Sequence, residues 1–315
     1  MTVLHHTDNK SGDLVQCQLF YVNDNQQAQI ERLQSLIAEH KLPIVLKTEL
    51  STEKLTQKRR QQLSQTSSQP ILLLDEKDKL SWLSDGLSVS PEWDKLQRRV
   101  VSAGRKSELL LQAAKITADS RVIDATAGFG HDSLILASTG AQVIMLEQQP
   151  LMALLLCAEQ QRMNAQPNWQ KLMSRLHIIN TDALSYFASL KADDISNDGN
   201  AVDVVYLDPM FPEDSYQDNK TGKGAKVGKH MQALHQLARP PTLDEERQLL
   251  NSAKVIVSRS AQGQGRVIVK RPQFAPLLAD EPFSESWHNE AVRFDGYFAG
   301  HRFFEDYFIA TVCDK

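Results

Sequence analysis

The chain has 315 residues, of which 41% are hydrophobic and 23% are charged, as in an ordinary globular protein. A net charge of -4 and a pI near 6.1 argue against a protein that is basic throughout, so any binding of nucleic acid must rest on local basic patches. Three cysteines stand far apart with no Cys-x-x-Cys pair, and no apolar run reaches the length of a membrane span, so we expect no disulfide framework, no metal centre and no membrane segment. The polar amino terminus lacks the apolar core of a signal peptide, and we expect a cytoplasmic protein.

Residues 1–88 are expected to form a small α/β extension ahead of the main domain. Apolar and polar patterns predict, in order, a strand at 15–22, an amphipathic helix at 25–41, a strand at 43–46, a polar helix within 53–69, and paired strands at 70–75 and 80–83. This part carries no motif of its own. We interpret it as an element that packs against the main domain or orients the substrate.

Residues 90–118 are predicted to be helical, with Ser90 as the cap and Pro91 at the first helical position. Basic side chains gather around a break at Gly104, namely Arg98, Arg99, Arg105 and Lys106. A basic cluster at a break can hold phosphates, but it is as often a solvated helix face. Both interpretations stay open.

The stretch 121–147 is predicted to be a strand, a glycine turn, a helix and a second strand. The first apolar run ends in Asp124, the turn contains Gly128 and Gly130, and the second run ends in Glu147. Glycines let the backbone approach a ligand, and the start of a helix offers free N–H groups. The acid about twenty residues after the turn lies where a ribose contact belongs. This is the first βαβ unit of a nucleotide-binding fold.

The pattern departs from a dinucleotide fingerprint, which has a third glycine near Ser133. The alternative interpretation is that the glycines only permit the turn and that Asp132 only caps the helix. The remaining elements favour the ligand-binding fold. They are a helix at 150–166, a strand at 176–179, a buried strand at 201–207, a helix at 243–258, a strand at 266–270, and strands at 293–297 and 307–312. Alternating strands and helices indicate an α/β, doubly wound sheet over 89–315 with an added hairpin at its end.

A second motif, Asp208-Pro-Met-Phe-Pro, follows the strand at 201–207. Open α/β sheets bind ligands at the carboxyl ends of their strands. The carboxylate of Asp208 and a nearby carbonyl can accept both hydrogens of an exocyclic amine, and Phe211 can offer a face to a flipped-out base. The alternative is a strand that simply ends at Asp-Pro, with Phe211 in the core. Together with the glycine unit, the motif predicts that Asp208, Pro209 and Phe211 are catalytic.

Five separated blocks carry a resemblance to the ribosomal RNA small-subunit methyltransferase J family: DATAGFGHD, VIMLE, VVYLDPMFP, RVIVKRPQFAP and VRFDGYFAG. The resemblance covers about residues 90–300 and gives no support for 1–85. It implies a Rossmann-like class I methyltransferase that uses S-adenosylmethionine as cofactor. It also implies that the acceptor is the exocyclic N2 of a guanine in small-subunit (16S) rRNA, whether naked or in a 30S particle.

The resemblance also implies roles for individual residues. The cofactor would be bound by the turn and the strand ends, that is by Asp124, Gly128, His131, Asp132, Glu147, Gln148, Asp182, Ala183 and Asp208. Glu147 and Gln148 would take the ribose, and Asp182 and Ala183 would flank the adenine. We do not assign His131 as a general base.

Basic residues expected near the same edge of the sheet are assigned to RNA: Arg105, Lys223, Lys226, Lys229, Lys270, Arg271 and Arg293. The alternative for the lysine-rich part is a solvated loop. The oligomeric state stays open. Three other functions remain: an amino-methyltransferase for DNA adenine or protein glutamine, a nicotinamide dehydrogenase, and a non-catalytic RNA-binding factor. The dehydrogenase would leave the motif at 208–212 unexplained.

Overall fold

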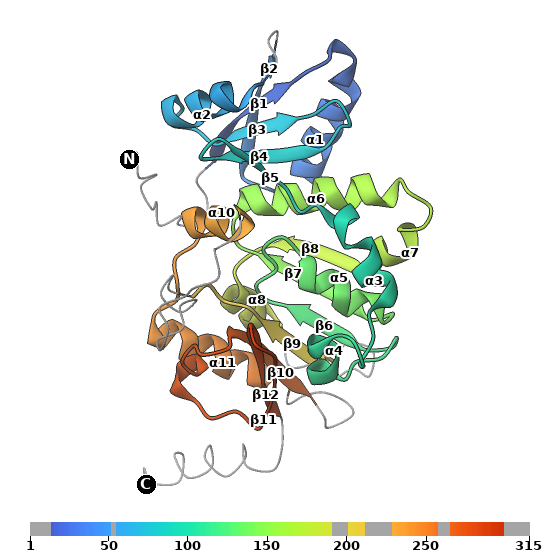
Figure 1. Ribbon diagram of the computed structural model, residues 1–315, viewed down its shortest axis with the longest axis vertical. Coiled ribbons are helices and arrows are strands. Elements are labelled where there is room, and N and C mark those ends of the chain that lie inside the picture. Colours follow the sequence, from blue (N-terminus) through green and yellow to red (C-terminus); the bar gives the residue numbers. More distant parts are fainter. Residues whose placement is uncertain (1–13, 52–54, 191–200, 212–228, 258–264, 299–315) are drawn as a thin grey trace.

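A computed structural model describes residues 14–51, 55–190, 201–211, 229–257 and 265–298, and side chains are described for these ranges except at 229–232. Two sheets lie one above the other along the long axis of the molecule (Figure 1), with the amino-terminal sheet at the top. No helix within these ranges has both the length and the apolar character that crossing a membrane would require.

The amino-terminal sheet has five strands in the order β2-β1-β3-β4-β5. They are β1 (Val15–Tyr21), β2 (Ile44–Leu50), β3 (Ile71–Leu74), β4 (Leu80–Ser84) and β5 (Leu87–Val89). Helix α1 (Gln27–Glu39) packs Ile30 and Leu33 on one face, and α2 (Gln57–Thr66) packs Leu63 on the other. The predicted strands and helices of this region are confirmed, whereas β5 was not predicted because it is only three residues long.

The second sheet has seven strands in the order β11-β12-β10-β9-β6-β7-β8. They are β6 (Arg121–Asp124), β7 (Gln142–Glu147), β8 (Leu176–Asn180), β9 (Val204–Leu207), β10 (Arg266–Pro272), β11 (Glu285–His288) and β12 (Val292–Phe298). The ladders from β8 through β10 are parallel, and β12 runs antiparallel to both its neighbours. The predicted doubly wound fold is confirmed. The predicted strand at 307–312 lies outside the described residues. Strand β12 pairs with β10 and with β11, which was not predicted.

Helices cover both faces of this sheet. They are α3 (Gln97–Ser102), α4 (Leu109–Ala114), α5 (His131–Ser138), α6 (Pro150–Asn164), α7 (Gln170–Met173), α8 (Ala183–Ser189) and α11 (Leu243–Val257), whereas α10 (Lys229–Leu237) contacts β5. Helix α6 lies between the two sheets and contacts α1 and β4 on one side and β7 and β8 on the other (Figure 1). This explains its unbroken apolar run, because a helix that is hydrophobic all round is buried. One apolar core therefore continues from the amino-terminal sheet into the second sheet.

The segment that joins the sheets differs from its prediction. Helical structure starts only at η2 (Trp93–Leu96), so Ser90 is not a cap and Pro91 is not at a first helical position. Glu92 has a left-handed φ of 53°, and Ala103 is extended, which separates α3 from α4. The reason is tertiary, because the carbonyl of Pro91 is used by a side chain of the glycine turn, as described below.

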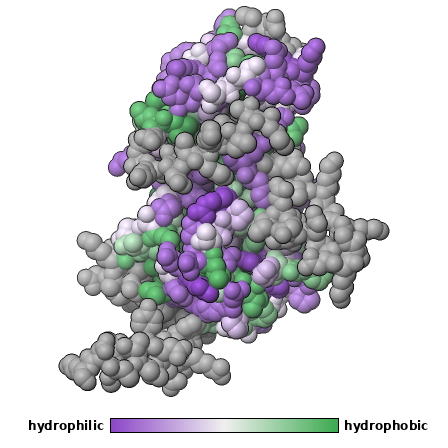
Figure 2. All heavy atoms as spheres, turned by 90° about the vertical axis from the view of Figure 1, so that its left-hand side faces the viewer, coloured by the Kyte–Doolittle hydropathy of each residue, from purple (hydrophilic) through white to green (hydrophobic). Residues whose placement is uncertain are grey.

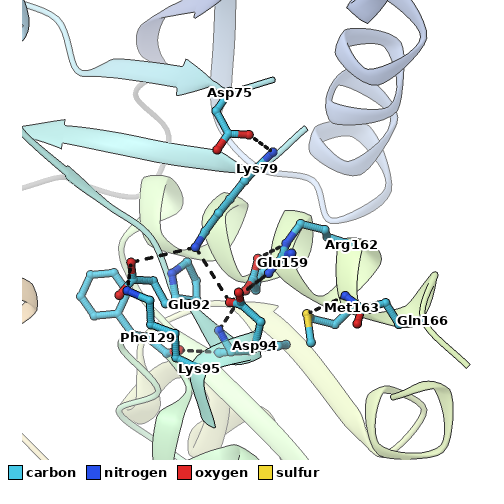
Figure 3. Close-up of polar contacts among 12 residues, drawn as sticks. Asp75, Lys79, Glu92, Asp94, Lys95, Phe129, Glu159, Arg162, Met163 and Gln166 are labelled. Atoms are coloured by element: carbon cyan, nitrogen blue, oxygen red, sulfur yellow. Dashed lines mark hydrogen bonds and ion pairs between the residues drawn. The ribbon is translucent and has the colours of Figure 1, made fainter. Parts of the chain in front are cut away.

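Ion pairs tie this joining segment to the amino-terminal sheet and to α6 (Figure 3). Lys79, in the turn between β3 and β4, lies 4.0 Å from Glu92 and 3.9 Å from Asp94. Asp94 pairs with Arg162 of α6, and Arg162 pairs with Glu159 one turn earlier. The partly exposed pairs of Lys79 and Asp94 are each worth less than about 1 kcal/mol, so their effect is mainly to fix the geometry of the segment.

Candidate active site

The two glycines of the turn after β6 serve different ends. Both have positive φ, 54° at Gly128 and 72° at Gly130. A Cβ atom on Gly130 would lie 2.7 Å from Met145 and 3.0 Å from the Trp93 ring, so this position is needed for packing. A Cβ on Gly128 would meet nothing closer than Leu234 at 3.8 Å. Only Gly128 leaves its backbone open to a ligand, which is the role predicted for it.

Asp124 ends β6 and is buried. The Ser133 hydroxyl donates to one carboxylate oxygen at 2.5 Å, and the Thr126 amide donates to the other at 3.2 Å. Burial raises the pKa of Asp124 to about 7, against these hydrogen bonds. Ser133 occupies the place where a dinucleotide fingerprint would have its third glycine. Its hydroxyl fixes the turn to the strand end instead.

Glu147 ends β7, and its carboxylate faces the glycine turn. Its Oε2 accepts from the Gly128 amide at 3.0 Å, and its Oε1 accepts from the Gln149 amide at 2.7 Å. Burial raises the pKa of Glu147 to about 7. A carboxylate has about four acceptor positions, so each oxygen keeps one for a ribose hydroxyl.

The predicted adenine-side residues follow β8. The Asp182 side chain caps α8 by accepting from the Ser185 amide at 2.8 Å, and Ala183 begins that helix, half-buried. Asn180 donates to the Glu147 carbonyl at 2.8 Å, which holds the ends of β7 and β8 together. Gln148 is exposed beside them. The strand ends therefore bring these residues to the same edge as Glu147.

A lysine and two carboxylates from three elements meet at this edge. The Nζ atom of Lys270, near the end of β10, lies 2.8 Å from Oδ2 of Asp132 and 2.8 Å from Oδ2 of Asp208. The Tyr206 hydroxyl donates to the same Asp132 oxygen at 2.7 Å. We call Asp132, Tyr206, Asp208 and Lys270 the carboxylate–lysine cluster. The sequence predicts an RNA contact for Lys270, whereas in the structure its ammonium group is held by carboxylates.

The charges of this cluster depend on one another. Burial raises the pKa of Asp208, and the Lys270 ammonium opposes that shift. For Asp132, burial also favours the neutral form, but Lys270 and the hydrogen bond from Tyr206 outweigh it and lower the pKa. The two carboxylates in turn raise the pKa of Lys270 against the effect of burial. Asp132 and Lys270 are therefore charged at neutral pH, and Lys270 favours the carboxylate form of Asp208.

Asp208 lies at the topological switch point of the sheet, between β6 and β9. Its amide donates to the Thr126 hydroxyl at 2.6 Å, so the predicted catalytic motif is tied to the glycine turn. Parallel α/β sheets bind their ligands outside the carboxyl ends of the strands at such a point. The structure thus brings the two motifs of the sequence together.

Phe211 is buried, with 3% of its surface exposed, and the guanidinium of Arg271 lies 4.4 Å from its ring centroid. Arg271 is held by Glu246 at 3.3 Å and by the Pro276 carbonyl at 2.9 Å. Pro209 is also buried. The open aromatic face expected for a flipped base is therefore not present in this conformation, because an arginine that was assigned to RNA covers it.

Of the other residues assigned to RNA, some lie outside the described residues and others have partners within the protein. Lys223 and Lys226 lie outside the described residues, and Lys229 begins α10 with an undescribed side chain. Arg293 pairs with Asp295 at 2.8 Å. The exposed Arg105 donates to the carbonyls of Lys115 and Ile116 at the end of α4.

The segment that joins the two sheets forms hydrogen bonds with the glycine turn and with the first residue of α5. The Trp93 indole donates to the Phe129 carbonyl at 2.8 Å, and its amide donates to Glu159 at 2.9 Å. His131 Nε2 lies 2.6 Å from the Pro91 carbonyl, and burial lowers the pKa of His131. A carbonyl only accepts, so this nitrogen is the donor and is unavailable to a cofactor. Nothing in the local pattern around Trp93 signals this contact.

The residues at this edge fit S-adenosylmethionine. Gly128 leaves space beside its backbone, and Glu147 keeps acceptor positions for ribose hydroxyls. The buried or half-buried carboxylates of Asp124, Asp132 and Asp208 suit a ligand that carries a sulfonium and an ammonium group.

Glu147→Gln should weaken binding of S-adenosylhomocysteine roughly tenfold at pH 8, because an amide oxygen accepts less strongly than a carboxylate. In the wild type, affinity should rise as the pH increases through about 7, where the buried carboxyl group loses its proton. In Glu147→Gln this rise should be much smaller, with Asp124 as the remaining neighbour that titrates near 7. Calorimetry at pH 6 and pH 8 measures both effects. If the affinity of the variant depended on pH as strongly as that of the wild type, Glu147 would not be a ribose-binding residue.

Trp93→Phe keeps an aromatic ring in this buried position, but it removes the indole donor and the part of the indole that packs against Gly130. Because the Phe129 carbonyl then loses its partner, we expect the turn to loosen and the Kd for S-adenosylhomocysteine to rise about three- to tenfold. Calorimetry gives the Kd, and thermal unfolding shows whether the fold is kept. Lys95→Ala, which changes only an exposed pair of the same segment, is the control.

Known proteins match this chain over most of its length. The family model described as "Putative SAM-dependent methyltransferase" matches residues 47–299. Ribosomal RNA small subunit methyltransferase J of Psychrobacter cryohalolentis is 78% identical over 286 residues, which cover 90% of this chain and 96% of that protein. The protein of the same name from Acinetobacter baylyi is 38% identical over 219 residues, 69% of this chain and 77% of that protein.

A solved structure agrees on the fold. The SAM-dependent methyltransferase of Neisseria gonorrhoeae covers 90% of this chain and 96% of its own, with a TM-score of 0.61 at 23% identity. The glycine turn, the acid that ends β7 and the motif after β9 occupy the ligand edge of this fold. The chain belongs to the ribosomal RNA small subunit methyltransferase J family of S-adenosylmethionine-dependent methyltransferases.

Proposed function

We propose that this protein transfers the methyl group of S-adenosylmethionine to the exocyclic N2 of a guanine in small-subunit rRNA. The observation that carries the proposal is the position of Asp208, next to the glycine turn at the switch point and held there by Thr126 and Lys270. The names of the relatives supply the class of substrate. Because that substrate is ribosomal, we place the reaction in the cytoplasm.

Asp208 is the residue that we assign to the amine. Lys270 occupies its Oδ2, and within the described residues no donor lies on Oδ1. Oδ1 can therefore accept a hydrogen of the guanine amine, and a carbonyl of the motif can accept the other. Two acceptors turn the nitrogen lone pair away from the ring and fix its direction, so most of the catalysis comes from positioning. The cofactor, when bound, supplies an electrophilic methyl group.

Lys270 keeps this acceptor charged. Without its ammonium group, burial and the neighbouring Asp132 would both favour a protonated Asp208, whose carboxyl group accepts from the amine less strongly than a carboxylate. After transfer, the methylated nitrogen sheds a proton to Asp208 or to water. Asp132 of α5 holds Lys270 in place, and the Tyr206 hydroxyl of β9 donates to the same Asp132 oxygen.

Phe211 stays our candidate for stacking on the target base, with one condition. Its ring is covered by Arg271, so stacking requires the ring or the guanidinium to move when RNA binds. Glu246 and the Pro276 carbonyl hold Arg271 from the other side and set the cost of that movement. Arginine planes also stack on bases, so Arg271 can form part of the same surface.

A labelled methyl transfer assay tests the proposal. Wild-type protein is incubated with labelled S-adenosylmethionine and, in separate reactions, with 30S particles, deproteinised 16S rRNA, DNA and total protein. We expect label in RNA from at least one of the first two reactions. Label in DNA or in protein alone would support an amino-methyltransferase of another class, and no transfer at all would support an RNA-binding factor.

A further inference from the structure

The outer face of α2 carries positive charge that folding does not explain. Residues 55–74 include Lys58, Arg59 and Arg60 and contain no Asp or Glu. All three basic residues lie in the first turn of α2, where Thr56 is the cap and no acid is present. Cations at a helix N-terminus oppose the helix dipole, so this placement costs stability. Lys58 and Arg59 are exposed.

Arg60 differs from its two neighbours because it is used within the fold. Its guanidinium donates to the Leu55 carbonyl at 2.9 Å and to the Ser88 hydroxyl at 3.3 Å. The Arg59 side chain donates to Gln62 at 3.2 Å, one turn along the same helix. Among the described residues, Lys58 and Arg59 form no ion pair. Their charges therefore face outward.

A chain of contacts leads from α2 to the glycine turn. Gln57 donates to the Gly86 carbonyl at 3.1 Å, and a Cβ atom on Gly86 would lie only 3.0 Å from the Gln61 backbone. The adjacent Ser84 and Asp85 both hydrogen-bond the Gln236 side chain of α10.

Helix α10 follows the Asp208 motif in the chain, and its Leu234 lies beside Gly128. In Figure 1, α2 and α10 lie on the same side of the molecule, and α1 and α7 lie on the opposite side. Figure 2 looks onto the α2 side and shows that the amino-terminal part is mostly hydrophilic there. Helix α2 is thus on the side of the molecule that carries α10, the helix whose Leu234 lies beside Gly128 (Figure 1).

We propose that Lys58 and Arg59 of α2 form a second RNA contact, which binds phosphates of the substrate outside the target nucleotide. This inference rests on the proposed function. RNA is favoured over a membrane or a protein because the exposed residues of α2 are glutamine, threonine and cations, with no large apolar side chain to anchor a lipid or protein surface. Such residues bind phosphates and sugars without reading sequence. The amino-terminal part of the chain would then enlarge the surface that binds rRNA.

The test compares two charge reversals in the full-length protein. Lys58→Glu/Arg59→Glu changes the proposed contact, and Lys77→Glu/Lys171→Glu makes the same change in charge at exposed positions of the β3–β4 turn and of α7. The β3–β4 turn contacts Gln26, before α1, and α7 lies across the molecule from α2 (Figure 1). Acids in the first turn favour a helix, so the α2 variant should unfold at the same temperature as the wild type or higher.

For the α2 variant we expect about a tenfold higher KM for RNA, with unchanged kcat at saturating RNA and unchanged affinity for S-adenosylhomocysteine. Filter binding to deproteinised 16S rRNA should show a salt dependence shallower by about 1 to 2 in log–log slope, as two phosphate contacts are lost. The control should stay within about twofold of wild type. An equal loss in the control, or no loss in the α2 variant, would overturn the proposal. So would a loss with 30S particles alone, which would point to a ribosomal protein.

The failure of this proposal and the failure of the proposed function are distinguishable. Wild-type protein that binds RNA through α2 but methylates none would overturn the function and leave the contact standing. RNA methylation that is unaffected by the α2 substitutions would overturn the α2 contact and leave the proposed function standing.

Discussion

Asp208→Asn should lower kcat roughly 10²- to 10³-fold, which is the range for loss of one preorganised group at a reacting centre, and should lower the affinity for S-adenosylhomocysteine, which lacks the sulfonium charge, much less. The amide keeps the shape of the side chain but replaces one acceptor by a donor. That donor faces the hydrogens of the amine, so the nitrogen is no longer held in its reactive orientation. Single-turnover kinetics with saturating RNA and calorimetry with S-adenosylhomocysteine separate the two quantities.

The fold is not expected to suffer in this variant. Lys270 keeps its partner Asp132, and the backbone N–H of residue 208 keeps its hydrogen bond to the Thr126 hydroxyl. A variant with wild-type kcat would show that the motif after β9 is only a strand end, the alternative that the sequence leaves open.

Lys270→Met should lower kcat/KM about 10²-fold at pH 7 and move its acidic limb to higher pH. The methionine fills a similar volume, but two carboxylates then face each other without a cation. Both their pKa values rise, because the Lys270 ammonium group no longer opposes burial and mutual repulsion. Activity needs the carboxylate of Asp208, so it should be lost at low pH and partly regained as the pH rises. A pH–rate profile from about pH 6 to pH 9 measures this.

Two further measurements distinguish this account of Lys270 from an RNA contact. If Lys270 acted mainly on phosphates, the variant would raise the KM for RNA with an unshifted pH profile. Lys270→Arg should retain more activity than Lys270→Met, because its charge still stabilises both carboxylates. Thermal unfolding of both variants controls for loss of the fold.

The sequence predicts those parts of the site that each lie within a single short stretch of the chain. The glycine turn, the acid at the end of β7 and the motif after β9 each follow an apolar run, and the carboxyl end of a strand is where such residues act. The strands themselves were predicted because continuous apolar runs mark buried parallel strands. Short or half-exposed strands such as β5 and β11 carry no such signal.

The sequence does not predict which charges pair. Lys270 is 138 residues from Asp132 and 62 from Asp208, so its role depends on the order of the strands. Once β10 is known to lie beside β9 with Val269 opposite Leu207, Lys270 falls next to Asp208. Strand register does not predict the contacts of Trp93 and Arg271, because their partners lie on loops and helices. Three residues assigned to RNA by their charge and their expected place at this edge of the sheet, Lys270, Arg271 and Arg293, hold acidic partners in the structure.

Mass spectrometry of nucleosides tests the central claim most directly. Small-subunit rRNA from cells that lack the gene is incubated, naked or in 30S particles, with S-adenosylmethionine and either wild-type protein or Asp208→Asn, and is then digested. The account predicts one N2-methylguanosine per rRNA molecule with the wild type and almost none with the variant over the same time. A methyl group on any other atom of the RNA, or equal yields from the two proteins, would contradict it.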